Sequence, residues 1–135
     1  MMNPEISLRV PGEKSYALVL RLALGGVAIL KDLDAGTLDD LRVASDEACD
    51  CLLHQGRTVE TLTLTVVDGG SDLTVTIAAD FACEKAERPQ DCEEETEISR
   101  AVLETLVPHV ALHAADCGCI ARIDLTLPKA VRVGA

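Results

Sequence analysis

The 135-residue chain has almost no aromatic side chains, since it contains no tryptophan, one tyrosine (Tyr16) and one phenylalanine (Phe81). Proteins that bind single-stranded nucleic acids without sequence preference stack the bases on aromatic rings, so this scarcity argues against that class of function. A hydrophobic content of 48% nevertheless indicates a globular chain. Its core must therefore be built from leucine, valine, isoleucine and alanine.

Basic residues are also few. Twelve lysines and arginines face 23 aspartates and glutamates, which gives a formal net charge of −11. Nucleic-acid phosphates are bound by clusters of lysine and arginine, so we expect no nucleic-acid partner. An acidic surface is complementary to a basic protein surface, and we expect a protein partner instead.

Long hydrophobic runs are missing as well. The apolar segment 16–30 is interrupted by Arg21 and is shorter than the roughly 20 residues that cross a bilayer, so we interpret it as a core helix and expect no membrane association. The first thirty residues show no secretory signal pattern, which favours a cytoplasmic protein. The length fits a single domain over residues 1–135.

Cysteine is plentiful, but the Cys-x-x-Cys spacing is missing. The six cysteines are Cys49, Cys51, Cys83, Cys92, Cys117 and Cys119. Structural zinc sites usually carry the Cys-x-x-Cys spacing, so we predict no metal site and interpret most of these thiols as small, reduced hydrophobic residues. A disulfide between Cys83 and Cys92 stays open as an alternative.

Periodicity in the first half of the chain predicts a strand and two helices. Apolar and polar residues alternate over 5–10, which is typical of a strand with one buried side. The pattern turns helical over 13–30 and again over 38–55, where the glycine that follows supplies the stop. Thr37 and Asp40 resemble a capping pair at the start of the second helix.

The second half predicts two hairpins around a third helix. Threonine and valine alternate on both sides of the turn 68–71, and a second hairpin has its turn near 116–118. Between them lie an acidic loop over 84–97 and a helix over about 94–106. This order of elements predicts an α+β, two-layer sandwich: a mixed, mostly antiparallel sheet of about five strands with three helices on one face.

Three stretches of the chain are similar to a known family. They are "SLRVPGEKSYALVLRLALGGVA" (7–28), "DDLRVASDEACDCLLHQG" (39–56) and "ISRAVLETLVPHVAL" (98–112). With the two hairpins, the chain resembles the anti-sigma-factor serine/threonine kinases over about residues 5–128. Those kinases share the histidine-kinase-like (GHKL) ATPase fold with gyrase, the heat-shock chaperone and the mismatch-repair ATPase. The middle stretch carries the residue-level match.

The resemblance implies roles for two residues of the middle stretch. The family motif Glu-Ala-x-x-Asn places a general base at its glutamate and a magnesium ligand at its asparagine. Here "EACDC" puts Glu47 at the base position and Cys51 at the asparagine position. A neutral thiol is a poor ligand for magnesium, which prefers oxygen donors. Asp46 and Asp50 are adjacent but point in other directions around a helix.

The family's two other nucleotide elements are weaker here. An Asp-x-Gly that reads adenine has no direct counterpart, and Asp80 fits it only if the register shifts by one residue. The glycine-rich box, whose backbone N–H groups approach phosphates, is replaced by "EEETEISRA", which has no glycine and four glutamates. These acids repel a triphosphate. The resemblance therefore implies a degenerate member that keeps the fold and has lost ATP chemistry.

Three functions follow as hypotheses. The first is an anti-sigma regulatory factor that binds a sigma factor or its antagonist, forms a homodimer, and needs no cofactor. The second is an active kinase that binds ATP and magnesium, in which Glu47 deprotonates a serine of the antagonist while Asp46 or Asp50 positions magnesium. The third is a redox or metal sensor that uses the clustered cysteines.

Overall fold

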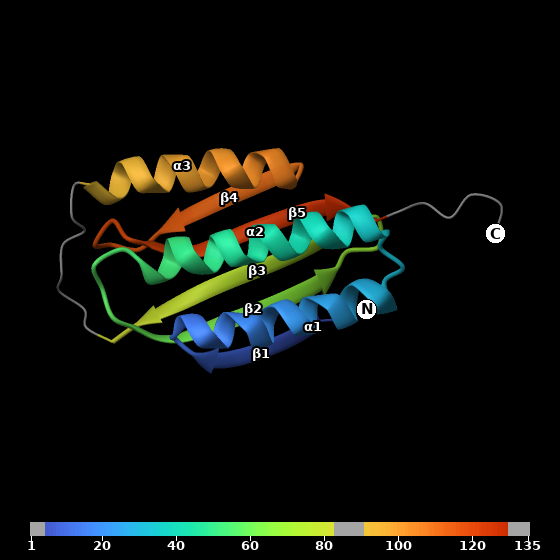
Figure 1. Ribbon diagram of the computed structural model, residues 1–135, viewed down its shortest axis with the longest axis horizontal. Coiled ribbons are helices and arrows are strands. Elements are labelled where there is room, and N and C mark those ends of the chain that lie inside the picture. Colours follow the sequence, from blue (N-terminus) through green and yellow to red (C-terminus); the bar gives the residue numbers. More distant parts are fainter. Residues whose placement is uncertain (1–4, 83–90, 130–135) are drawn as a thin grey trace.

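The computed structural model describes residues 5–82 and 91–129, which form five strands and three helices in two layers (Figure 1). The elements in chain order are β1 (Glu5–Pro11), the short 3-10 helix η1 (Lys14–Tyr16), α1 (Ala17–Leu30), α2 (Ala35–Leu53), β2 (Val59–Asp68), β3 (Asp72–Phe81), α3 (Asp91–Leu106), β4 (His109–Ala114) and β5 (Ile120–Pro128). No described helix combines the length and apolar character needed to cross a membrane.

The sheet has the strand order β1-β2-β3-β5-β4, and the three helices cover one of its faces (Figure 1). This confirms the predicted α+β sandwich. All four strand pairings are antiparallel, so the sheet is not mixed. The topology explains this. Helices α1 and α2 together connect β1 to its antiparallel neighbour β2. Helix α3 connects β3 to β4, which lies at the edge of the sheet and pairs with β5.

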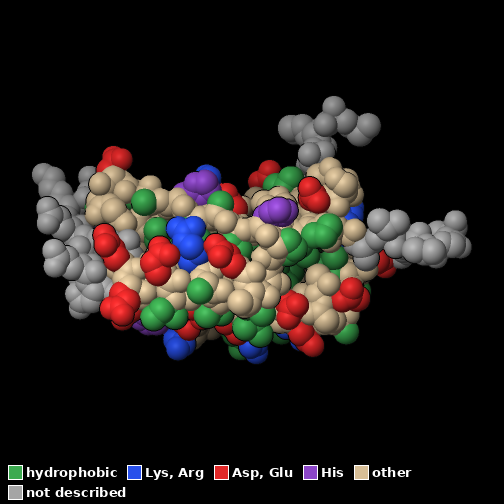
Figure 2. Space-filling view, turned by 90° about the horizontal axis from the view of Figure 1, so that it is seen from above, with side chains coloured by type: hydrophobic (Ala, Val, Ile, Leu, Met, Phe, Trp, Pro, Cys, Tyr) green, Lys and Arg blue, Asp and Glu red, His purple; other side chains and the backbone are tan. Residues whose placement is uncertain are grey.

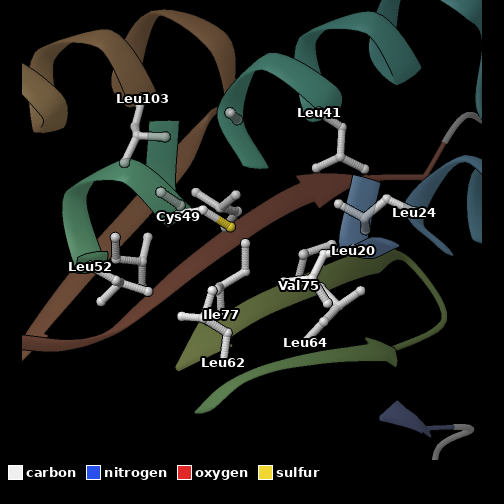
Figure 3. Packing of buried hydrophobic residues seen from close by; sticks show 14 of the residues in the cluster. Leu20, Leu24, Leu41, Cys49, Leu52, Leu62, Leu64, Val75, Ile77 and Leu103 are labelled. Carbon is white, nitrogen blue, oxygen red and sulfur yellow. The ribbon is translucent and has the colours of Figure 1, made fainter. Parts of the chain in front are cut away.

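Alternation along the strands builds the core between the sheet and the helices. On β3, Leu73, Val75 and Ile77 are fully buried, whereas Thr74 and Thr76 between them are partly exposed. The buried face of the sheet meets leucines of the helices, including Leu20 and Leu52 (Figure 3). Aliphatic side chains make up nearly all of this cluster, as the scarcity of aromatic residues predicts.

All three helix starts differ from their predictions, and α1 begins at Ala17, after the short helix η1, and not at residue 13. Helix α2 begins at Ala35, because the Asp34 side chain accepts a hydrogen bond of 2.7 Å from the Thr37 N–H and caps the helix. The predicted Thr37–Asp40 capping pair is therefore wrong. Helix α3 begins at Asp91, so the acids of 91–97 are helical and not part of a loop. Negative side chains are favourable in the first turn of a helix, where they oppose its dipole.

Both predicted hairpin turns are confirmed. Gly70 lies in the β2–β3 turn with φ 91°, and Gly118 lies in the β4–β5 turn with φ 89°. Residues with a side chain rarely adopt this conformation. Next to the first turn, Asp68 accepts hydrogen bonds from Lys129 at 2.8 Å and lies 3.0 Å from the Lys31 ammonium. These contacts, with Lys129 as the largest cause, hold the pKa of Asp68 well below its usual value.

Candidate functional site

The two family positions on α2 lie on one side of the helix. Glu47 and Cys51 are four residues apart, which places them one above the other on a helix surface. Glu47 is half-buried, and it forms no hydrogen bond or ion pair with any residue that the structure describes. Cys51 is buried, with 9% of its surface exposed, and lines a small cavity between α2 and α3. Asp80 is absent from this cavity.

The cavity beside Cys51 has a volume of about 160 Å³. Its walls are Asp50, Cys51, His54, Gln55, Glu95, Thr96 and Ser99. Pockets that hold drug-sized ligands usually have about 300–1,000 Å³, so this one is small for a nucleotide. Among the described residues, two carboxylates and no lysine or arginine line it. A triphosphate placed there would be repelled and not neutralised.

Asp80 lies on the other face of the sheet. It follows Ala79, which is 7% exposed and faces the helices, so alternation directs Asp80 to the uncovered face. There its carboxylate accepts a hydrogen bond of 2.7 Å from the Thr61 hydroxyl. The sheet therefore separates Asp80 from Cys51, and its role in reading adenine stays a prediction.

Asp46 and Asp50 lie near basic residues of η1 and α1. Asp46 pairs with Arg21 at 3.1 Å, and Asp50 lies 3.9 Å from the Lys14 ammonium. Asp50 also lines the cavity, whereas Asp46 does not. Of the two carboxylates that the kinase hypothesis needs for magnesium, only Asp50 is therefore placed near Cys51.

Cys49 lies in the core and not in the cavity. Its sulfur points among the aliphatic side chains beneath α2 (Figure 3), and it is 1% exposed. Burial raises the pKa of the Cys49 thiol to about 12, and the nearby negative charges of Asp46 and Asp50 add to this effect. The interpretation of cysteines as buried hydrophobic residues is thus confirmed for Cys49 and Cys51. The alternative Cys83–Cys92 disulfide lies outside the described side chains.

Gln55 is a residue that sequence reasoning missed. It is 2% exposed, its amide nitrogen donates to the Ile120 carbonyl at 2.8 Å, and its amide oxygen accepts from the Ile120 N–H at 2.6 Å. The end of α2 is thereby joined to the first residue of β5. The only local signal is a polar residue placed directly before Gly56, at the end of an apolar helix face.

Arg57 is a second missed residue. Its Nη1 lies 2.9 Å from the Cys117 sulfur, and its guanidinium lies 4.3 Å from the centre of the Phe81 ring. The contact joins the segment after α2 to the Cys117-Gly118-Cys119 turn of the β4–β5 hairpin. Within the described side chains, no group of three or more histidine, cysteine, aspartate and glutamate residues is arranged to hold a metal ion.

Comparison with known proteins finds likeness in structure only. No family model matches the chain, and no curated protein does. A solved structure that is similar is the crystal structure of the RsbU and RsbW domains of Rv1364c from Mycobacterium tuberculosis, with a TM-score of 0.70 and 12% identity. The match covers 98% of this chain and 35% of that one, so the chain spans about a third of its structural neighbour. The likeness shows an RsbW-like α+β fold.

Proposed function

We propose that the chain is an anti-sigma-type regulatory factor that acts by binding another protein and has lost the nucleotide chemistry of the fold. The observation that carries this proposal is an uncovered apolar face on α1. A helix that is hydrophobic all round is normally buried on all sides. Helix α1 has one charged residue, Arg21, yet the rest of the described chain covers only one side of it.

The uncovered face forms a continuous stripe, which we call the α1 face. It consists of Leu18, Val19, Leu22, Gly26, Ile29 and Leu30. At 3.6 residues per turn, these positions occupy about one third of the helix circumference. Leu22, Ile29 and Leu30 are 65%, 75% and 74% exposed. Val43 of α2 lies beside Leu22 and extends the face. Clusters of exposed apolar residues of this kind mark interaction sites.

The cavity beside Cys51 supports the loss of nucleotide chemistry. A thiol occupies the position of the magnesium ligand, and the cavity is small and acidic. Binding another protein needs neither a magnesium ligand nor a nucleotide-sized cavity, because a partner is held by apolar contacts and complementary shape. The partner that the resemblance to the anti-sigma-factor kinases implies is a sigma factor or its antagonist, and a second copy of the chain would use the same face to form a homodimer.

The test is a pair of matched charge substitutions. Leu22→Asp in the α1 face is expected to weaken binding to a sigma factor or antagonist partner at least about tenfold, because a charge replaces an apolar anchor. Ile98→Asp on α3, which is 60% exposed and lies outside the α1 face, is the control and should leave affinity unchanged. Calorimetry gives the affinities and light scattering the oligomeric state. Equal affinities for both variants would contradict the assignment of the face.

The kinase hypothesis makes a different prediction for the same protein. Glu47, half-buried and one helical turn from Cys51, keeps a base position that lacks a described partner. If the site works, Mg-ATP raises the melting temperature in a saturable way, and Glu47→Gln abolishes phosphorylation of the antagonist. On our proposal, Mg-ATP leaves the melting temperature unchanged. A saturable rise in the melting temperature would contradict our proposal and support the kinase hypothesis.

A further inference from the structure

The turn of the β4–β5 hairpin carries two cysteines, one on each side of Gly118. Cys117 is half-exposed, whereas Cys119 is fully buried. Two backbone hydrogen bonds close the turn: the Ala115 N–H donates to the Cys119 carbonyl at 2.8 Å, and the Gly118 N–H donates to the Ala115 carbonyl at 2.9 Å. Gly118 between them adopts φ 89°, a conformation that lets the chain turn tightly between the two cysteines.

A cation completes the site. The Arg57 guanidinium donates to the Cys117 sulfur over 2.9 Å and is held against Phe81. Its Nε–H is buried and has no acceptor among the described residues, so the group retains an unused donor. Hydrogen bonds from Cys119, followed by the charge of Arg57, lower the pKa of the Cys117 thiol. A thiolate, and not a thiol, is the reactive form of cysteine.

Reagents can reach the Cys117 sulfur from solvent. An open hollow of about 450 Å³ has Arg57, Phe81, Asp116 and Cys117 in its walls. Redox-sensitive cysteines combine thiolate character, access to solvent and a neighbouring resolving cysteine. This turn has all three.

We propose that Cys117 is a modification site for hydrogen peroxide and that Cys119 resolves the oxidised sulfur as a Cys117–Cys119 disulfide. The site is independent of the α1 face and of the identity of any partner. It adds a sensor to a binding protein, because the state of the turn records exposure to an oxidant.

The chemistry balances in two steps. The Cys117 thiolate attacks one oxygen of hydrogen peroxide, the O–O bond breaks, and the sulfur becomes a sulfenic acid while the departing hydroxide takes a proton and leaves as water. The Cys119 sulfur then attacks the Cys117 sulfur. The S–O bond breaks, an S–S bond forms, and the hydroxyl leaves with the Cys119 proton as a second water. Two thiols are oxidised to one disulfide, and one peroxide is reduced to two waters.

Trypsin supplies a direct test in the unaltered protein. Cleavage after Arg100 and Arg122 releases peptide 101–122, which contains both cysteines of the turn, and cleavage after Arg42 and Arg57 releases peptide 43–57, which contains Cys49 and Cys51. After brief treatment with hydrogen peroxide, mass spectrometry should find peptide 101–122 lighter by two hydrogen atoms, and restored by dithiothreitol, while peptide 43–57 stays reduced. A reduced turn, equal oxidation of both peptides, or a disulfide from Cys117 to any other cysteine would overturn the proposal.

Three variants separate the steps. Cys119→Ala should stop the reaction at the Cys117 sulfenic acid, which a carbon nucleophile such as dimedone traps. Arg57→Gln should slow oxidation at pH 7 several-fold and move its pH profile upward, and Arg57→Lys should restore most of the rate because it restores the charge. A pH profile that is the same in all three proteins would show that Arg57 does not activate the sulfur.

Discussion

The same spacing, Cys-x-Cys, occurs in two regions with opposite chemistry. In α2, Cys49 and Cys51 flank Asp50, and burial together with nearby acids raises the pKa of Cys49 to about 12. In the β4–β5 turn, Cys117 and Cys119 flank Gly118, and Arg57 lies against the exposed sulfur. A helix directs neighbours two apart to different sides, whereas the turn reverses the chain between its two cysteines at Gly118.

The difference shows that cysteine spacing alone does not determine reactivity. The backbone decides whether two sulfurs meet, and the nearest charge decides whether either ionises. Asp46 and Asp50 disfavour a thiolate in α2, while Arg57 favours one in the turn. Three predictions test this contrast.

The largest expected effect is on alkylation by iodoacetamide in the folded protein. A pKa of about 12 leaves only about one Cys49 thiol in 10⁵ ionised at pH 7, and burial blocks the reagent as well. Cys117 should therefore be alkylated orders of magnitude faster than Cys49, as measured by mass spectrometry of the two tryptic peptides over time. In urea the two rates should converge. Similar rates in the folded state would remove the contrast.

A smaller effect, on the free energy of unfolding, is expected from substituting Gln55, which joins the end of α2 to the start of β5. Gln55→Leu leaves the Ile120 N–H and carbonyl without their partners. An unsatisfied buried group costs about 1–3 kcal/mol, so the free energy of unfolding should fall by about 2–4 kcal/mol. Urea denaturation measures it.

The control for this variant is Thr105→Val, which removes an exposed side-chain hydrogen bond to the Val102 carbonyl. It should change the free energy of unfolding little, because water can satisfy the freed carbonyl. If Gln55→Leu were as stable as Thr105→Val, the amide would not hold the turn to α2. Faster alkylation of Cys119 in Gln55→Leu is expected as well, since the start of β5 loses its anchor.

The smallest effect is on stability at alkaline pH. Because the folded pKa of Cys49 is raised, the unfolded chain releases this proton first, and stability is lost as pH rises from the unfolded pKa toward about 12. The slope is about 1.4 kcal/mol per pH unit. Cys49→Ala should lose less stability than the unaltered protein between pH 9.5 and 10.5, measured by urea denaturation. Parallel curves would contradict the raised pKa. The contribution of Cys117 to stability depends on pH in the opposite direction, because its pKa is lowered in the folded protein.

Local patterns predicted most of the fold. Alternation and the glycines at 70 and 118 identified both hairpins, because turns and pleats depend on neighbours in the sequence. The helix starts were less accurate, since Asp34 and the acids at the start of α3 act through capping and the helix dipole. These effects do not follow from apolar periodicity.

The sites were predicted in part. The resemblance placed Glu47 and Cys51 on one helix face, but it could not settle on which side of the sheet Asp80 lies. Gln55 and Ile120 are 65 residues apart, and Arg57 and Cys117 are 60 apart. Apart from the polar residue directly before Gly56, neither pair leaves a local trace in the sequence, because each depends on how the last hairpin docks against the end of α2.

The Gln55 amide has a consequence for how the protein can change over time. Its side chain lines the cavity beside Cys51 and also holds the first residue after Cys119. A substitution at Gln55 that reshapes the cavity therefore also removes the hydrogen bonds that hold the Cys117-Gly118-Cys119 turn to the end of α2. The two features can diverge among descendants of this chain only if another residue first takes over one of the two contacts, so their sequences should vary together.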